Sequence, residues 1–160
     1  TLPIVSAPLS ELEAVDFAVF KALNDLPLAM TAHILYTALD ANECATFSPI
    51  VMKYIREEIG FAGLIMSDDL SMKALGGSFA ERTERSLAAG CDLVLHGNGA
   101  LIGEPVRDLM GELKQVAAAS VVLSPESIAR ANAAAEQRRS PKPAEEIALL
   151  AEWQQSLAVA

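Results

Sequence analysis

Cysteine and long apolar runs are both scarce in this sequence. The two cysteines, Cys44 and Cys91, have neither metal-ligand spacing nor a second pair, so we expect reduced thiols and no metal site. No stretch reaches the ~18 uninterrupted apolar residues of a membrane span, and the N-terminus lacks the basic-then-apolar pattern of a secretion signal. We therefore expect a cytoplasmic protein with no membrane partner.

Positive charge is scarce as well. The 12 Lys and Arg residues stand against 21 Asp and Glu residues, which gives a net charge of -9, and they form no basic run. A surface that follows nucleic-acid phosphates is basic, so nucleic acid is not an expected partner. Hydrophobic residues, in contrast, make up 52% of the 160 residues, which is enough to build the core of one globular domain.

The chain is organised around Gly60–Met72. The apolar run that follows Gly63 predicts a short buried strand, and two adjoining carboxylates, Asp68 and Asp69, come directly after it. The C-terminal ends of parallel strands carry the catalytic groups of many α/β enzymes, which favours a catalytic role. Aspartate also favours turns and helix caps, which is the alternative interpretation of this pair.

Strands and helices are predicted to alternate along the chain. Apolar runs begin near residues 28, 63 and 92, and a spacing of about 30 residues matches a βαβ unit, so the sheet is expected to be parallel. Capping boxes begin helices at Ser10 and Ser78, and serine–proline pairs begin them at Ser48 and Ser124. The expected strands are 28–36, 63–67 and 92–95, and the expected helices are 10–26, 48–60, 78–90, 106–116, 124–139 and 144–159, with a stiff linker at 140–143.

The number of strands leaves two architectures open. No G-x-G-x-x-G or G-K-[ST] motif follows any of the three strands, so they do not make a finished nucleotide-binding sheet. A complete (β/α)8 barrel needs ~250 residues. The chain is therefore either a small three-stranded α/β domain or the last part of a barrel whose earlier strands are not in this sequence.

Several short motifs lie in order between residues 28 and 98. They are Met30-Thr31-Ala32-His33-Ile34-Leu35-Tyr36, Phe47-Ser48, Ile55-Arg56, Gly60-Phe61-Ala62-Gly63, Ser67-Asp68-Asp69-Leu70-Ser71-Met72 and Ala88-Ala89-Gly90-Cys91-Asp92-Leu93. In these motifs the sequence resembles glycoside hydrolase family 3, and within it the bacterial cytosolic β-N-acetylglucosaminidases of peptidoglycan recycling.

The resemblance implies the C-terminal portion of a (β/α)8 TIM barrel with trailing helices. Residues 1–123 would supply the last βα units of the barrel, and residues 124–160 the helices packed on it. It also implies a retaining hydrolase that removes non-reducing terminal β-1,4-linked N-acetylglucosamine from anhydro-muropeptides. Asp68 matches the position of the family's nucleophile, which forms a covalent glycosyl-enzyme, and Asp69 is expected to be either a turn residue or a residue that supports the nucleophile without taking part in the reaction. The implied partner is this small glycan, and no cofactor is implied.

The chain departs from the family pattern at its start. It opens with Thr1-Leu2-Pro3, which in the family follows an Asp-Ser-His motif that carries the general acid/base histidine. That histidine and the Lys-His and Arg residues that hold the sugar are absent here, so we expect these 160 residues alone to be inactive. His33 is expected either to bind substrate as part of the pocket wall or to pack inside the protein, and His96 either faces the same pocket or is a plain loop residue.

Two other functions fit the same residues. Paired aspartates at the end of a parallel strand suit Mg²⁺-dependent phosphoryl transfer in a receiver-like α/β domain, although neither Lys53 nor Lys73 leaves a buried strand as that chemistry needs. A remnant that binds muropeptides without catalysis is the third interpretation. The sequence gives no indication of the oligomeric state.

Overall fold

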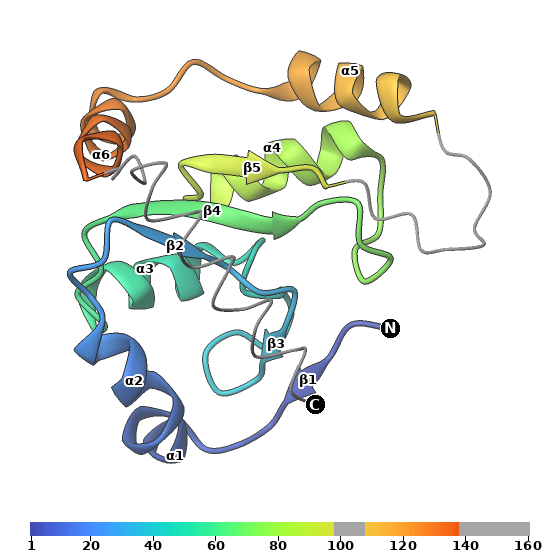
Figure 1. Ribbon diagram of the computed structural model, residues 1–160. Helices are drawn as coiled ribbons and strands as arrows, with labels where there is room; N and C mark the ends of the chain where they lie inside the picture. Colours follow the sequence, from blue (N-terminus) through green and yellow to red (C-terminus); the bar gives the residue numbers. More distant parts are fainter. Residues whose placement is uncertain (98–107, 138–160) are drawn as a thin grey trace, which may run out of the picture.

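The structure is a computed structural model that describes residues 1–97 and 108–137. Its strands are β1 (Ile4–Val5), β2 (Leu28–Met30), β3 (Leu35–Tyr36), β4 (Leu64–Asp69) and β5 (Leu93–Leu95). Strands β2, β4 and β5 form one parallel sheet with β4 in the middle, and β1 and β3 form a separate parallel pair. In Figure 1 the three strands of the larger sheet lie side by side and point the same way.

Helices connect the strands. They are α1 (Leu9–Ala14), α2 (Asp16–Ala22), α3 (Pro49–Glu57), α4 (Phe79–Ala89), α5 (Leu109–Ala119) and α6 (Pro125–Glu136). The elements β2, α3, β4, α4 and β5 alternate along the chain and make two βαβ units, which confirms the predicted α/β class with a parallel sheet. Helix α6 follows later and packs near the start of β4 and β5 (Figure 1).

The helix starts predicted from capping residues are confirmed for three helices. Ser48, Ser78 and Ser124 each cap a helix by accepting a hydrogen bond from the backbone N–H three residues further on. Ser78 also completes the predicted capping box. Gly60 follows α3 with φ of 78° and Gly90 follows α4 with φ of 123°, backbone conformations that favour glycine and end both helices where predicted.

The single helix predicted over 10–26 is wrong in its start and its length. The chain instead forms α1 and α2, which meet at Val15, and α1 begins one residue before Ser10 with no side-chain cap. The buried residues of the two helices are Leu12 and Phe17, five positions apart, a spacing that a straight helix would not place on one side. The bend lets both reach the core. Four other apolar residues of this segment are exposed: Val15, Val19, Phe20 and Leu23.

The strand predicted over 28–36 is also wrong, because it is divided between two sheets. Strand β2 belongs to the larger sheet and β3 pairs with β1. The last backbone bond from this stretch to β4 is that of the Thr31 N–H to the Met66 carbonyl, and the side chains of Thr31 and His33 hydrogen-bond to Thr46 where the strand breaks. The linker at 140–143 and the helix at 144–159 lie outside the described residues, and the division of the chain at residue 123 stays a prediction.

Within the described residues, one face of the larger sheet is covered and the other is open. Ile65 of β4 is 1% exposed and lies in one core cluster with Met52 of α3 and Ala89 of α4. On the opposite face Leu28 and Met30 of β2 are 45% and 52% exposed. This uncovered face of apolar side chains positions the candidate site.

Candidate active site

Asp68 lies near the C-terminal end of β4, on the uncovered face of the sheet. Over residues 66–68 burial alternates, since Ser67 is buried while Met66 and Asp68 are partly exposed, as expected for side chains that point alternately to the two faces. The alternation ends at Asp68, because Asp69 is also partly exposed and the pairing with β5 is irregular between Met66 and Asp69. Met30, the partner of Met66 in the sheet, is exposed on the same face. The carboxylate predicted to be the nucleophile therefore faces the open side of the sheet.

The two adjoining carboxylates have different surroundings. Asp69 Oδ1 accepts hydrogen bonds from the backbone N–H groups of Ser71 and Gly97, both at 2.8 Å, and Oδ2 accepts one from the Ser71 hydroxyl at 2.8 Å. The Asp68 carboxylate accepts one hydrogen bond from the described residues, from the N–H of Asp69 to Oδ1 at 2.8 Å. Asp68 Oδ2 is thus the oxygen of this pair that the described residues leave open to an incoming atom.

Asp69, the last residue of β4, joins the end of β4 to the turn at Ser71 and to Gly97 after β5. Burial raises its pKa, but the hydrogen bonds from Ser71 and Gly97 outweigh burial and bring the pKa below its ordinary value. Gly97 reaches the carboxylate because it has no side chain, since a Cβ there would lie 2.7 Å from Asp69 Oδ2. A magnesium site would need both carboxylates, and the oxygens of Asp69 already hold N–H and O–H donors, so this arrangement does not favour phosphoryl transfer.

Three buried side chains from other segments hold the end of β4. Thr31 Oγ1 accepts a hydrogen bond from the backbone N–H of Asp68 at 3.1 Å, and His33 Nε2 lies 2.9 Å from the backbone carbonyl oxygen of Asp69. Thr46 Oγ1 joins the two, at 2.9 Å from both Thr31 Oγ1 and His33 Nδ1. We call Thr31, His33 and Thr46 the buried network.

Neither histidine is placed as a free pocket residue. His33 is 2% exposed and both of its ring nitrogens have protein partners, which favours the packed-histidine interpretation, and its contact with substrate stays a prediction. His96 has a side chain that is 3% exposed, with Nε2 at 2.9 Å from Glu112 of α5 and its ring 5.0 Å from that of Phe79 of α4. His96 is therefore packed between two helices.

Arg82 of α4 fixes the loop that follows β4. Its guanidinium donates hydrogen bonds to the backbone carbonyls of Leu70 at 2.6 Å, Leu75 at 2.7 Å and Gly77 at 3.1 Å. The same group lies 5.0 Å above the ring of Phe79, a cation–π contact. One side chain thus determines the course of the loop beyond the two aspartates.

Sequence reasoning missed Thr31, Thr46 and Arg82 as parts of this site. Thr31 bonds to residues 15 and 37 positions away, and Arg82 to carbonyls 5 to 12 positions before it in an irregular loop, so no regular local spacing reveals these contacts. One observation could have found part of the network. Thr31 and His33 are the polar residues of an otherwise apolar motif, and buried polar groups require hydrogen-bond partners.

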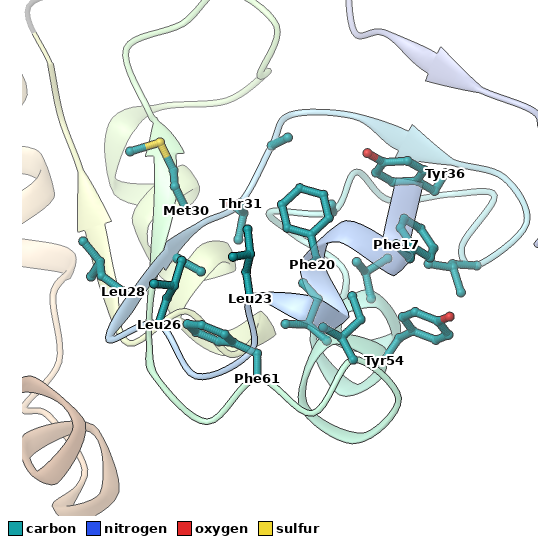
Figure 2. Close-up of a pocket in the computed structure, with 17 residues that line it drawn as sticks. Phe17, Phe20, Leu23, Leu26, Leu28, Met30, Thr31, Tyr36, Tyr54 and Phe61 are labelled. Carbon is teal, nitrogen blue, oxygen red and sulfur yellow. The ribbon is translucent and has the colours of Figure 1, made fainter. Parts of the chain in front are cut away.

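A pocket of about 260 Å³ lies beside the edge of β2 that faces away from β4 (Figure 2). Its wall is mostly aliphatic and aromatic, and it includes Phe17, whose ring centroid lies 5.8 Å from that of Tyr36 and 5.5 Å from that of Tyr54. Neither Asp68 nor His33 lines it. The pocket therefore offers few polar groups for a sugar, and it reaches the surroundings of Asp68 only through Met30 and Thr31, which line it.

The described residues contain no metal-binding cluster, no membrane-spanning helix and no reactive cysteine. Among residues 1–97 and 108–137, no three His, Cys, Asp or Glu side chains are grouped to hold a metal ion. No helix in that part of the chain has the length and apolarity needed to cross a membrane. Cys44 and Cys91 are free thiols, and burial raises the pKa of both, that of Cys91 to about 12, so neither is a reactive thiolate.

Most of this chain is similar to known glycoside hydrolases. The family described as Glycosyl hydrolase family 3 N terminal domain matches residues 1–133. A beta-hexosaminidase from Neisseria meningitidis is 42% identical over 112 residues, which are 67% of this chain and 31% of that protein. This chain therefore spans less than half of the length of the curated relative.

Solved structures give the same result. NagZ from Neisseria gonorrhoeae, in complex with N-trifluoroacetyl-D-glucosamine, is 36% identical with a TM-score of 0.55, over 72% of this chain and 36% of that one. The β-N-acetylglucosaminidase from Thermotoga maritima is 28% identical with a TM-score of 0.62, over 85% of this chain and 30% of that one. Together with the family match over most of its length, these likenesses show that the chain belongs to glycoside hydrolase family 3.

Proposed function

We propose that the full-length protein is a retaining β-N-acetylglucosaminidase in which Asp68 is the nucleophile. The names of similar proteins support the reaction, since they are a beta-hexosaminidase and a β-N-acetylglucosaminidase. The observation that carries the proposal is that Asp68 Oδ2 has no hydrogen-bond partner among the described residues, whereas both oxygens of Asp69 do. A carboxylate that attacks a sugar needs an oxygen free to reach the anomeric carbon.

The proposed reaction has two steps. Asp68 Oδ2 forms a bond to the anomeric carbon while the glycosidic C–O bond breaks, and the leaving oxygen takes a proton from a general acid. Water then attacks the glycosyl-enzyme, gives a proton back to the same group and releases the sugar. The family resemblance assigns the acid/base to a histidine of an Asp-Ser-His motif that is not in these 160 residues. We expect no turnover by this chain alone, because general acid–base catalysis contributes about 10²–10⁴-fold.

We also propose that the chain is the C-terminal portion of a (β/α)8 barrel, with residues 1–123 as its last βα units and 124–160 as helices packed on it. Both edge strands of the described sheet, β2 and β5, pair on one side only within the described residues. Leu28 and Met30 are exposed on the uncovered face, and Phe20 is 60% exposed near the unpaired edge of β2. Exposed apolar surface of this extent favours coverage by further strands or helices of the barrel. Under this proposal the side chains of those strands or helices fill the pocket in Figure 2.

The proposed substrate is a muropeptide with an anhydro sugar, from which the enzyme removes a terminal β-1,4-linked N-acetylglucosamine in the cytoplasm during peptidoglycan recycling. The structure of a similar protein holds N-trifluoroacetyl-D-glucosamine, which supports recognition of an N-acylated glucosamine. The motif Ser67–Met72 and the motifs around it support an assignment of this chain to the peptidoglycan-recycling enzymes within the family. The proposed reaction uses no metal ion and no organic cofactor.

Trapping of the glycosyl-enzyme tests the role of Asp68. The full-length protein is incubated with a 5-fluoro-N-acetylglucosaminyl donor, digested, and analysed by mass spectrometry. We expect the label on the peptide that contains Asp68, and a label on a peptide that lacks it would refute this role. Asp68→Asn should lower kcat by on the order of 10⁴–10⁶-fold. Asp69→Asn is the matched control, because it keeps the attacking carboxylate and should still be labelled at Asp68.

A further inference from the structure

We propose that the buried network of Thr31, His33 and Thr46 is a positioning device for the nucleophile, fixing the backbone on both sides of the Asp68 side chain. The inference rests on the proposed role of Asp68 and adds residues that do not touch the sugar. Its first support is the placement of the contacts. Thr31 binds the N–H of Asp68 and His33 binds the carbonyl of Asp69, so the strand is held immediately before and after the peptide that links the two aspartates.

That linking peptide completes the arrangement. Its N–H, on Asp69, donates to Asp68 Oδ1 at 2.8 Å. One oxygen of the candidate nucleophile is thus oriented by the N–H of Asp69, the residue whose carbonyl His33 holds, while the other oxygen has no hydrogen-bond partner among the described residues. A shift of the strand end would therefore turn the Asp68 carboxylate directly.

One donor in the network is fixed by chemistry. A carbonyl oxygen accepts only, so His33 Nε2 must donate to Asp69. Thr46 Oγ1 lies 2.9 Å from both His33 Nδ1 and Thr31 Oγ1, and it donates to the Ala32 carbonyl at 3.2 Å. Thr31 Oγ1 accepts from the N–H of Asp68. Thr46 is therefore the residue through which the side chains of Thr31 and His33 are connected.

The network is buried and joins segments that are distant in sequence. Thr46 is 0% exposed, His33 2% and Thr31 8%. Water cannot easily replace a lost partner at such a depth, so removal of one member leaves the others unsatisfied. Thr31 follows β2, His33 precedes β3 and Thr46 precedes α3, and all three converge on the end of β4. Such contacts suit the holding of one strand end in a single position.

The inference is tested in the full-length protein by removing one hydrogen bond at a time. Thr31→Val and Thr46→Val remove a hydroxyl at nearly constant volume, and His33→Asn removes the Nε2 donor. We expect each to lower kcat on a chromogenic N-acetylglucosaminide by about 10²-fold, as a displacement of about 1 Å from the reactive geometry does, with KM unchanged. His33→Gln, which can place an N–H near the position of Nε2, and Thr31→Ser, which keeps the hydroxyl, should recover most of kcat.

Thr83→Val is the matched control. Thr83 is also 0% exposed, but its hydroxyl bonds to the Phe79 carbonyl within α4, away from Asp68, so we expect kcat to stay at the wild-type value. Equal kcat for Thr46→Val and Thr83→Val would overturn the inference, and so would failure of His33→Gln to exceed His33→Asn. Fluoro-sugar labelling separates the two proposals. If Asp68 is labelled but the network variants keep wild-type kcat, only the positioning role is refuted. If another residue is labelled, the role of Asp68 as nucleophile is refuted, and the positioning role with it.

Discussion

Replacement of Asp92 by asparagine should strongly destabilise the protein. The side chain of Asp92, directly before β5, is 3% exposed and accepts four hydrogen bonds. The donors are Arg56 of α3 and Arg130 of α6, both at 2.8 Å, the backbone N–H of Ile65 in β4 at 2.8 Å, and the Ser127 hydroxyl of α6 at 2.6 Å. One carboxylate thus connects two helices to the sheet.

The magnitude follows from what Asp92→Asn leaves behind. Two guanidinium groups would remain close together without their counter-charge, and burial together with the charge of Arg130 already holds the pKa of Arg56 below its ordinary value. Removal of one partner from a buried ion pair costs about 3–5 kcal/mol. Glu43→Gln is the matched control, because the Arg85–Glu43 pair has side chains that are 46% and 42% exposed, and loss of such a pair costs about 0–1 kcal/mol.

Urea unfolding of the full-length variants measures both losses as changes in the free energy of unfolding. The pH dependence adds a second test. Burial raises the pKa of Asp92, but its hydrogen bonds and Arg130 outweigh burial, so the folded pKa lies below the unfolded value of about 3.9. The stability that Asp92 contributes is therefore complete above pH ~4 and is lost as the pH falls through the folded pKa. A loss no larger than that of Glu43→Gln, or one that does not shrink in acid, would refute the reasoning.

Two further substitutions, one of them with a control variant, test the turn before β4 and the start of α3. Gly63→Ala places a Cβ 2.5 Å from the backbone carbonyl of Leu26, so the chain must shift. We expect this variant to lose about 1–3 kcal/mol of unfolding free energy, measured by urea unfolding. Gly76→Ala is the control, because no atom lies within 4 Å of the added Cβ, and its unfolding free energy should stay within about 0.5 kcal/mol of wild type. Ser48→Ala removes both the cap on α3 and the hydrogen bond to Asp40 at 2.7 Å, and should cost about 2 kcal/mol by the same measurement. Equal effects of the two glycine variants, or an Ser48→Ala variant as stable as wild type, would contradict these expectations.

The parts of the fold that were predictable depend on neighbouring residues. Ser78 and Glu81 are three positions apart and cap each other, and Gly90 ends the helix they begin because its φ is positive. The order of strand and helix followed from the spacing of apolar runs. By contrast, the bend between α1 and α2 follows from which side chains the core accepts, which apolar periodicity did not reveal.

The candidate site was predictable only in its carboxylates. Asp68 and Asp69 come at the end of a recognisable apolar run, so their place at the end of a strand could be predicted from the sequence. The preference of aspartate for turns led to the prediction for Asp69. The residues that distinguish the two carboxylates did not follow, because Thr31 and Gly97 reach the strand end from positions 37 and 28 residues away. Such contacts exist only once the chain has folded.

Within residues 1–97 and 108–137 the outer edges of β2 and β5 have no partner strand, and this also matters for how the protein is made. Strand edges with free N–H and C=O groups attract strands from other molecules, and the apolar residues beside β2 strengthen that attraction. A longer chain synthesised from its N-terminus would have the covering strands ready when this segment leaves the ribosome. Expressed without those strands, the 160 residues would bind chaperones and tend to aggregate. Pairing of both sheet edges would therefore keep the protein soluble as well as complete the proposed catalytic barrel.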